Sequence, residues 1–123
     1  MTAPTKAEVK EFVEAAHGDL PKLQRMLAQK PDLLLIPNGN ETALGAACQM
    51  RRPDIIEFLL GQGETLNLSA ASVLGRTDQV AAFLDADPTL LNKGNKKAHN
   101  KHPLYFAEEQ PEVLALLKAH GAK

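Results

Sequence analysis

The sequence has few aromatic residues and no tryptophan. Aromatic residues make up 4% of the 123 positions, as four Phe and one Tyr. Apolar residues still account for 44% of the chain, so its core must be built from Leu, Ala, Val and Ile. Sheets are enriched in β-branched and aromatic residues, whereas Ala and Leu are strong helix formers. The composition therefore favours closely packed helices.

The low cysteine content, the lack of long apolar runs and the near-zero net charge limit the cellular location and the kinds of partner that we expect. Cys48 is the single cysteine, which excludes an internal disulfide and indicates a reduced, cytoplasmic location. No apolar run approaches the roughly 18 residues of a membrane span, and the N-terminal "MTAPTKAEVKEF" lacks the apolar stretch of a secretory signal. The 14 basic and 15 acidic residues leave a formal net charge of −1. We therefore expect no membrane contact, and nucleic acid is not the expected partner of the whole molecule.

The chain is long enough for one domain with a real core, and its first part predicts a pair of helices. Thr5 followed three residues later by Glu8 is the capping-box pattern of a helix start. Gly18 and Asp19 end that helix, and a second one follows. Apolar residues recur at helical spacing in both, at Val9, Phe12, Val13 and Ala16 and then at Leu20, Leu23, Met26 and Leu27.

The same helix–turn–helix pattern is repeated along the chain. A short helix "TALGAACQM", a turn "RRPD" and an outer helix "IIEFLLGQG" form the second copy, in which Pro53 suits a first helical position. A third copy reads "LSAASVLGRTDQVAAFLDAD", and a fourth, "HPLYFAEEQPEVLALLKAHG", has a turn proline at Pro111. The outer helices start near residues 21, 54, 78 and 112, at intervals of 33, 24 and 34. The inserts "KPDLLL" and "DPTLLN" predict an extra turn after the first and third outer helices.

A period near 33 with a helix pair in each unit resembles the ankyrin repeat. The second copy carries the resemblance best, with "TALGAAC" in the place of the family's Thr-Pro-Leu-His-x-Ala-Ala. The chain also looks like small stand-alone bacterial-type ankyrin-repeat proteins. The resemblance implies an all-α solenoid of about four degenerate repeats, approximately 5–36, 37–67, 68–97 and 98–123. In such a stack Ala46, Ala47 and Cys48 let neighbouring backbones approach, Thr42 caps the inner helix, and Gly63 permits a left-handed C-terminal turn.

The resemblance further implies a non-enzymatic protein-interaction module. Family members that bind partners generally use the tips of their finger loops and the exposed positions of the inner helices. The stretch "PNGNE" (37–41) predicts the first of these turns. Carried over residue by residue, the candidate partner-binding positions are Asn38, Asn40, Glu41, Gln49, Met50, Val73, Leu74, His99, Asn100 and Lys101. The protein partner itself is not identified by the sequence, and we expect a monomer.

Two features leave alternatives open. The stretch 93–102, "KGNKKAHNKH", has four basic residues, two histidines and no acid; it predicts a long loop that either binds an anion or nucleic acid, or is simply solvated. Val73 and Leu74 together with Met50 either form an exposed apolar patch, which would suit a homodimer, or Val73 and Leu74 turn into the core.

The residue types that carry catalysis or metal binding are sparse. His99 and His102 are separated by two residues, but zinc sites need three or four ligands, so we expect no metal and no other cofactor. Cys48 lies among alanines on a helix predicted to be buried, where its thiol is inert. His17 ends the first helix, where a histidine can bond the last carbonyls. We therefore expect no catalytic residues.

Overall fold

A computed structural model describes residues 3–123, and within this range the protein is all-α, with eight α-helices, three 3₁₀ helices and no β-strand. The α-helices are α1 (Lys6–Ala15), α2 (Leu20–Gln29), α3 (Ala43–Gln49), α4 (Pro53–Gly61), α5 (Leu68–Leu74), α6 (Thr77–Ala86), α7 (Pro103–Phe106) and α8 (Pro111–Ala119). The 3₁₀ helices are η1 (Pro31–Leu35), η2 (Pro88–Asn92) and η3 (Lys96–Ala98). Among these described residues, no helix has the length and apolar character that crossing a membrane requires.

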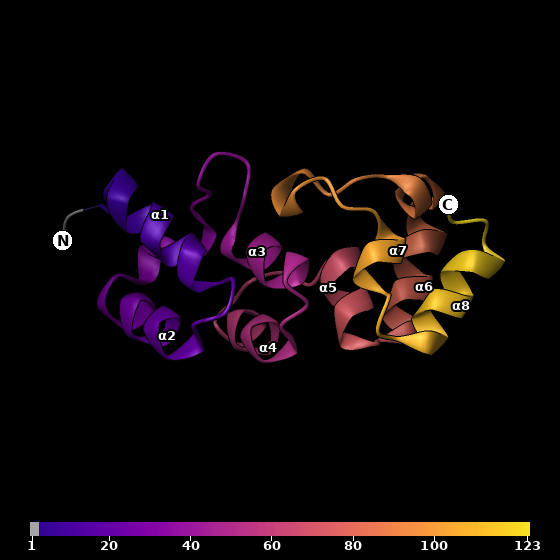
Figure 1. The fold of residues 1–123 in the computed structure, drawn as a ribbon, viewed down its shortest axis with the longest axis horizontal. Coiled ribbons are helices and arrows are strands. Elements are labelled where there is room, and N and C mark those ends of the chain that lie inside the picture. The colour runs from indigo at the N-terminus through magenta and orange to yellow at the C-terminus, as the bar shows by residue number, and fades with distance from the viewer. Residues whose placement is uncertain (1–2) are drawn as a thin grey trace.

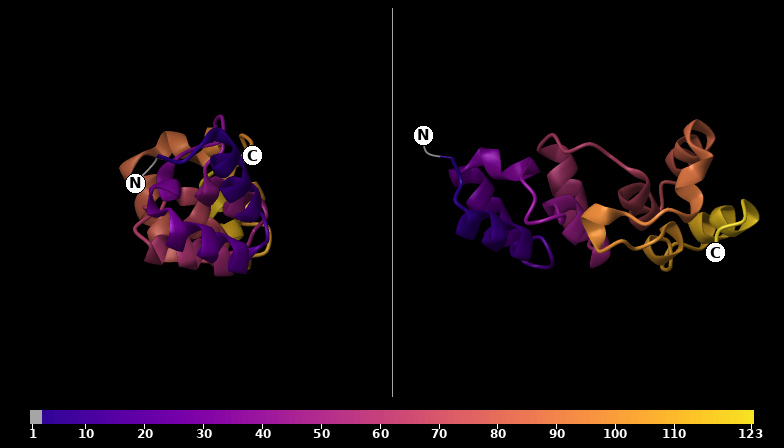
Figure 2. Two further views of the ribbon diagram at one scale, coloured as in Figure 1. Left: turned by 90° about the vertical axis from the view of Figure 1, so that its left-hand side faces the viewer. Right: turned by 90° about the horizontal axis from the view of Figure 1, so that it is seen from above.

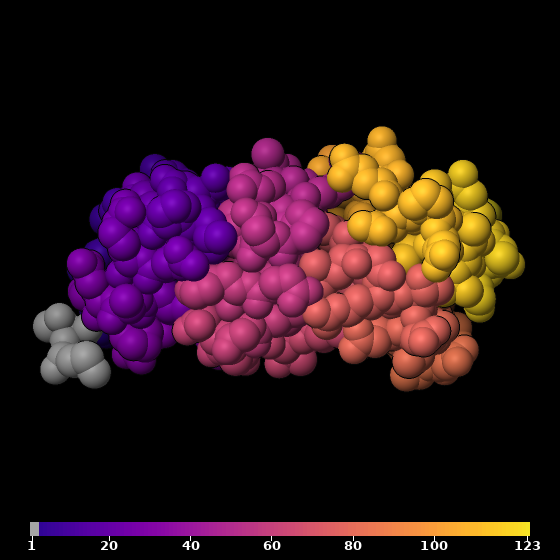
Figure 3. Space-filling model, turned by 90° about the horizontal axis from the view of Figure 1, so that it is seen from below, coloured from indigo at the N-terminus to yellow at the C-terminus, as the bar shows by residue number. Residues whose placement is uncertain are grey.

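Consecutive helices pack in pairs, α1 with α2, α3 with α4, α5 with α6, and α7 with α8. The first members of the pairs, which we call the inner helices, also contact one another in the order α1, α3, α5, α7. The pairs lie in a row, and the C-terminus is at the opposite end of the row from α1 (Figure 1). Two further views show that the row is long in one direction and narrow end-on (Figure 2). From below, successive segments follow one another in chain order along the long axis (Figure 3).

Several helices start at the capping residues and prolines that the sequence predicts as helix starts. The Thr5 hydroxyl accepts a hydrogen bond from the Glu8 N–H at 3.1 Å, and the Glu8 carboxylate accepts one from the Thr5 N–H at 2.9 Å. This capping box satisfies two backbone donors that have no partner inside the helix. The Thr42 hydroxyl caps α3, and Pro53 and Pro111 are the first residues of α4 and α8. The predicted starts of these helices are confirmed.

The connections between pairs also follow the sequence. The predicted extra turns "KPDLLL" and "DPTLLN" form η1 and η2, directly after the outer helices α2 and α6. Gly63 follows α4 with φ of 113°, a backbone conformation that a residue with a Cβ rarely adopts. The short connection between α4 and α5 leaves no room for a projecting turn there, as the interval of 24 residues indicates.

The core lies between neighbouring helix pairs and consists mainly of small and aliphatic side chains. Ala46, Ala47 and Cys48 of α3 are fully buried, because α3 is packed against α1, α4 and α5. The absence of long side chains at these positions lets the inner helices approach closely. The largest fully buried side chains are Phe12 of α1 and Phe106 of α7.

The apolar patch at the end of α5 is not formed. Val73 is 3% exposed and belongs to the core, and Leu74 is half-buried and packs against the same core. The physical reason is that α5 contacts α3, α4, α6 and α7, so little of its surface faces solvent. Val73 is therefore corrected from a partner-binding candidate to a core residue, and Leu74 offers only part of its side chain.

Candidate functional site

A tight turn precedes α3 and projects from the row of helices (Figure 1). Two backbone hydrogen bonds close it, from the Asn38 N–H to the Glu41 carbonyl at 2.8 Å and from the Glu41 N–H to the Asn38 carbonyl at 3.1 Å. Gly39 lies inside the turn with φ of 64°, in the left-handed region. The turn predicted from "PNGNE" is confirmed. Its closed backbone fixes the position from which the Glu41 side chain extends.

The stretch 93–102 forms a second, compact loop on the same side. The Asn95 N–H donates to the Lys101 carbonyl at 2.9 Å, and the Asn100 N–H donates to the Asn95 carbonyl at 2.8 Å. The Asn95 side-chain oxygen also accepts from the Lys97 N–H at 3.0 Å. His99 and Asn100 have positive φ of 56° and 58°, which turns the chain back on itself. The predicted long loop is present, and η3 together with these bonds gives it a defined shape.

Contacts with the inner helices hold this loop in place. The Asn95 side-chain amide donates to the Ser69 hydroxyl on α5 at 2.9 Å. The Lys97 carbonyl accepts a hydrogen bond from the Thr42 N–H at 3.3 Å. It lies so close to Gly45 that a Cβ on that residue would be 1.8 Å from the carbonyl oxygen. The loop is therefore packed directly against the start of α3.

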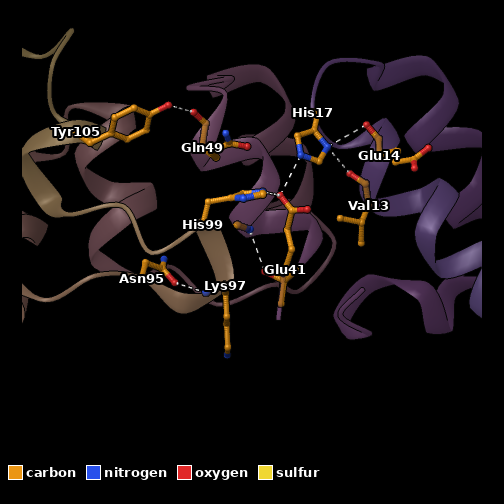
Figure 4. Close-up of polar contacts among 11 residues, drawn as sticks. Val13, Glu14, His17, Glu41, Gln49, Asn95, Lys97, His99 and Tyr105 are labelled. Carbon is orange, nitrogen blue, oxygen red and sulfur yellow. Dashed lines mark hydrogen bonds and ion pairs between the residues drawn. The ribbon is translucent and has the colours of Figure 1, made fainter. Parts of the chain in front are cut away.

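The turn and the loop meet at the Glu41 carboxylate, beside the end of α1 (Figure 4). His17 Nε2 lies 3.0 Å from Glu41 Oε2, and His99 Nε2 lies 2.7 Å from the same oxygen. The side chain of Glu41 is 16% exposed, that of His17 30%, and that of His99 50%. We call these three residues the His–Glu cluster. The cluster joins segments that are distant in the chain, since Glu41 is 24 residues from His17 and 58 residues from His99.

The His17 ring is held from its other side by the backbone of α1. Its Nδ1–H donates to the Val13 carbonyl at 2.9 Å and to the Glu14 carbonyl at 3.2 Å (Figure 4). This confirms the predicted role of His17 at the end of the first helix. The two carbonyls fix the orientation of the ring, with Nε2 directed at Glu41.

The turn and the loop enclose an open hollow of about 640 Å³. Its walls are polar, and we call this surface the turn–loop face. It is lined by Asn38, Asn40, Glu41, Lys96, His99 and Asn100. Five of the ten candidate positions are thus brought together, from two regions of the sequence, and Lys96 joins them. The hollow offers amide, carboxylate, imidazole and ammonium groups to a ligand.

Two of the remaining candidates, Gln49 and Lys101, lie beside Tyr105 rather than in the hollow. The Tyr105 hydroxyl donates to the Gln49 carbonyl at the end of α3, and the Lys101 ammonium lies 5.0 Å from the centre of the Tyr105 ring. Met50 is 48% exposed, so it is available on the surface. Gln49 is half-buried.

Arg51 was missed by the sequence reasoning, although it organises this second region. It has φ of 50°, and its guanidinium lies 4.1 Å from the centre of the Tyr105 ring. The Arg51 Nε–H donates to the Tyr105 carbonyl at 3.0 Å, and Nη2 donates to the Glu108 carboxylate at 2.7 Å. A cation over an aromatic face is a stabilising arrangement. The contact between Arg51 and Tyr105 could not be predicted from the sequence, because the two residues are 54 positions apart.

The single thiol does not belong to the site. Cys48 is fully buried on α3, and burial raises the pKa of its thiol well above the usual range, with the Glu64 carboxylate adding to the effect. The predicted core role of Cys48 is confirmed. His102 does not join His99 in a cluster: among the described residues, the group of side chains spaced to share a metal ion is His17, Glu41 and His99.

The structure defines a class of all-α protein in which helix pairs stand in a row and two turns create one polar face. The sequence matches no protein-family model, and no curated protein matches it. The fold and the turn–loop face therefore carry the functional assignment.

Proposed function

We propose that this protein is an ankyrin-repeat solenoid of about four degenerate repeats that acts as a non-enzymatic interaction module. It binds one protein partner through the turn–loop face and the adjoining ends of the inner helices. We further propose a cytoplasmic location, in keeping with the free thiol of Cys48.

The observation that carries this proposal is the convergence of two turns on one face. The turn at 38–41 and the loop at 93–102 come from different parts of the chain, yet their side chains line one hollow. Both are closed by backbone hydrogen bonds, and the loop at 93–102 also contacts α3 and α5. A surface that is already ordered loses little conformational entropy when a partner binds. Standard interfaces cover roughly 800 Å² on each partner, an area that needs several repeats side by side.

The environments of Cys48 and of the His–Glu cluster, within the described residues 3–123, support a binding role over an enzymatic one. The Cys48 thiol is buried and its pKa is raised, whereas a cysteine nucleophile must be accessible and present as the thiolate. The Nε2 atoms of His17 and His99 are both directed at the Glu41 carboxylate and not at a hydroxyl or thiol.

A specific observation supports the alternative that the loop at 93–102 binds an anion or nucleic acid. Lys96 lines the hollow, and Lys97 beside it is exposed, so an anionic ligand such as nucleic acid could be held electrostatically. The homodimer alternative is less well supported, because Val73, one of the residues of its apolar patch, lies in the core.

The proposal is tested by affinity capture from a lysate of the native cells, followed by binding measurements with the purified candidate. The face variant carries Asn40→Ala, Met50→Ala and Asn100→Ala. The control variant carries Arg25→Ala and Gln79→Ala, exposed positions on the outer helices α2 and α6. We expect one protein that binds the wild type and the control equally and the face variant at least tenfold more weakly.

Two results would count against this assignment. Equal binding by the face variant would show that the partner uses another surface. A captured nucleic acid whose binding falls steeply with added salt, and is lost with Lys96→Gln and Lys97→Gln, would favour the anion-binding alternative.

A further inference from the structure

The two histidines of the His–Glu cluster place three potential metal ligands around one point. His17 Nε2 and His99 Nε2 both approach Glu41 Oε2, and the ligand atoms of the three residues all lie within 4.8 Å of one another. Zinc binds to nitrogen at about 2.0–2.1 Å and to carboxylate oxygen at about 2.0–2.2 Å, so neighbouring ligands of a tetrahedral site are about 3.3 Å apart. The observed spacings of 3.0 and 2.7 Å need to open by only a few tenths of an ångström. The two nitrogens need to come together by at most about 1.5 Å to reach the same spacing.

The hydrogen bonds of His17 show why a cation is favoured at this point. Backbone carbonyls only accept, so the contacts to Val13 and Glu14 require a proton on Nδ1. In the neutral ring Nε2 then carries a lone pair, and that lone pair faces a carboxylate oxygen at 3.0 Å. Two lone pairs at this distance repel each other unless a proton or a metal ion lies between them. A metal-binding histidine typically donates its other N–H to a carbonyl or carboxylate, which is the arrangement of His17.

All three side chains are held by folded backbone. His17 is fixed at the end of α1 by its carbonyl contacts, and Glu41 extends from a turn closed by two hydrogen bonds. His99 lies in a loop whose ends are joined by the Asn95–Lys101 bridge. A set of ligands that is already positioned loses little entropy when an ion binds.

The chemistry of the set selects a class of ion. Two imidazoles and one carboxylate suit zinc and related divalent transition metals, whereas magnesium and calcium prefer oxygen ligands throughout. Three protein ligands leave a further coordination position open, and the side chains of Glu41 and His99 border the hollow. Lys96 also borders it and its charge opposes a cation, but its side chain is exposed and its long flexible stem lets the ammonium turn to solvent.

We propose that His17, Glu41 and His99 form a binding site for one divalent transition-metal ion of the zinc class. The ion joins the end of α1 to the turn at 38–41 and the loop at 93–102, the two segments that form the turn–loop face. Its fourth position, open to the hollow, is free to take water or a donor atom of a ligand. Zinc binding does not depend on the identity of the protein partner, so the site can be tested by itself.

The test is a titration of the full chain, freed of metal and of any polyhistidine tag, with zinc chloride in a calorimeter. We expect one ion per chain. His99→Gln and Glu41→Gln each remove a ligand, so each should weaken binding by more than the roughly 10- to 100-fold typical of a lost supporting residue. His102→Gln and His120→Gln are the matched controls, since both residues are exposed histidines outside the cluster, and they should bind zinc as the wild type does. Magnesium should not compete.

A second measurement on the unaltered chain keeps the test independent of variant folding. The ring nitrogen signals of His17 and His99 in a ¹⁵N NMR spectrum should shift on addition of one equivalent of zinc, while those of His102 and His120 stay in place. Bound Co²⁺ should also give the visible absorption of a four-coordinate ion. The proposal is overturned if no stoichiometric zinc binding occurs, if the controls lose binding as much as His99→Gln, or if the shifted signals belong to His102 or His120.

Discussion

Gly45 shows how a single side chain, or its absence, sets the distance between the loop and α3. The Lys97 carbonyl lies where a Cβ on Gly45 would stand, at 1.8 Å, and carbon and oxygen atoms that are not bonded cannot approach so closely. The φ of Gly45 is not in the left-handed region, so the requirement for glycine here is one of space. The loop that supplies His99 and Asn100 therefore depends on this position.

We predict that Gly45→Ala destabilises the protein by about 1–3 kcal/mol, the usual cost of forcing a group into a filled space. The obstacle is backbone, which cannot move aside as a flexible side chain can. Gly61→Ala is the matched control, because Gly61 is also helical and a Cβ there would meet no atom within 4 Å. That change should be neutral or stabilise by about 0.5–1 kcal/mol. Urea unfolding of the wild type and both variants measures the free energy of unfolding of each. If Gly45→Ala were as stable as Gly61→Ala, the loop at 93–102 could shift without cost.

The sequence predicted part of the site residue by residue. Asn38, Asn40 and Glu41 were placed on one face with His99 and Asn100, because finger loops of stacked repeats project on the same side, and these residues do line one hollow. His17 was interpreted only from its position at a helix end. Its contact with Glu41 could not be predicted, since it depends on how far the turn at 38–41 leans toward α1.

At the scale of the helix, α1 is stabilised at its start by charge as well as by its capping box. The Glu8 carboxylate lies 2.7 Å from the Lys30 ammonium, which connects the start of α1 with the end of α2. The hydrogen bond from Lys30, followed by the one from the Thr5 N–H, lowers the pKa of Glu8 from its usual 4.5 to about 2. The folded state therefore holds Glu8 ionised over a range of pH in which the unfolded chain binds a proton.

We predict that Glu8→Gln lowers stability at neutral pH and that this difference disappears in acid. A lowered pKa in the folded state contributes stability that is fully present above about pH 4.5 and is lost as the pH falls toward about 2. Glutamine retains an acceptor for the capping box, so the variant isolates the effect of the charge. Thermal unfolding of wild type and variant at several pH values measures the difference, with Glu109→Gln, an exposed carboxylate after α7, as the control. A difference that stays constant from pH 7 to pH 2 would contradict the assignment.

The sequence predicted where the helices start, but it did not predict which side chains of α5 are buried. Helix starts were readable because Thr5, Thr42, Pro53 and Pro111 act locally, through their own hydroxyls or their own missing N–H. Val73 was open to two interpretations because its burial depends on neighbours that are remote in sequence. The inner helix α5 is surrounded by four other helices, and this crowding decides which of its side chains reach solvent.

At the scale of the whole molecule, the buried side chains form two clusters rather than one. The first extends from α1 to α5 and includes Phe106 of α7, and the second joins α5, α6 and α8 through Leu68, Val80, Leu84, Val113 and Leu117. Each helix pair packs mainly against its neighbours in the row. In such an arrangement the ends can open while the rest of the molecule stays folded.

We predict that Val113→Ala loosens the C-terminal end of the row alone. Val113 is fully buried on α8, which packs on α6 and α7, and truncating a buried aliphatic side chain costs about 2 kcal/mol. Hydrogen exchange should therefore accelerate in α6 and α8, while α1 and α2 keep the protection of the wild type. Val13→Ala, the same change at a fully buried position of α1, is the mirror control and should accelerate exchange in α1 and α2 but not in α8. If either variant raised exchange equally in all the helices, the protein would open only as a single unit, and the row of helix pairs would be one cooperative structure from end to end.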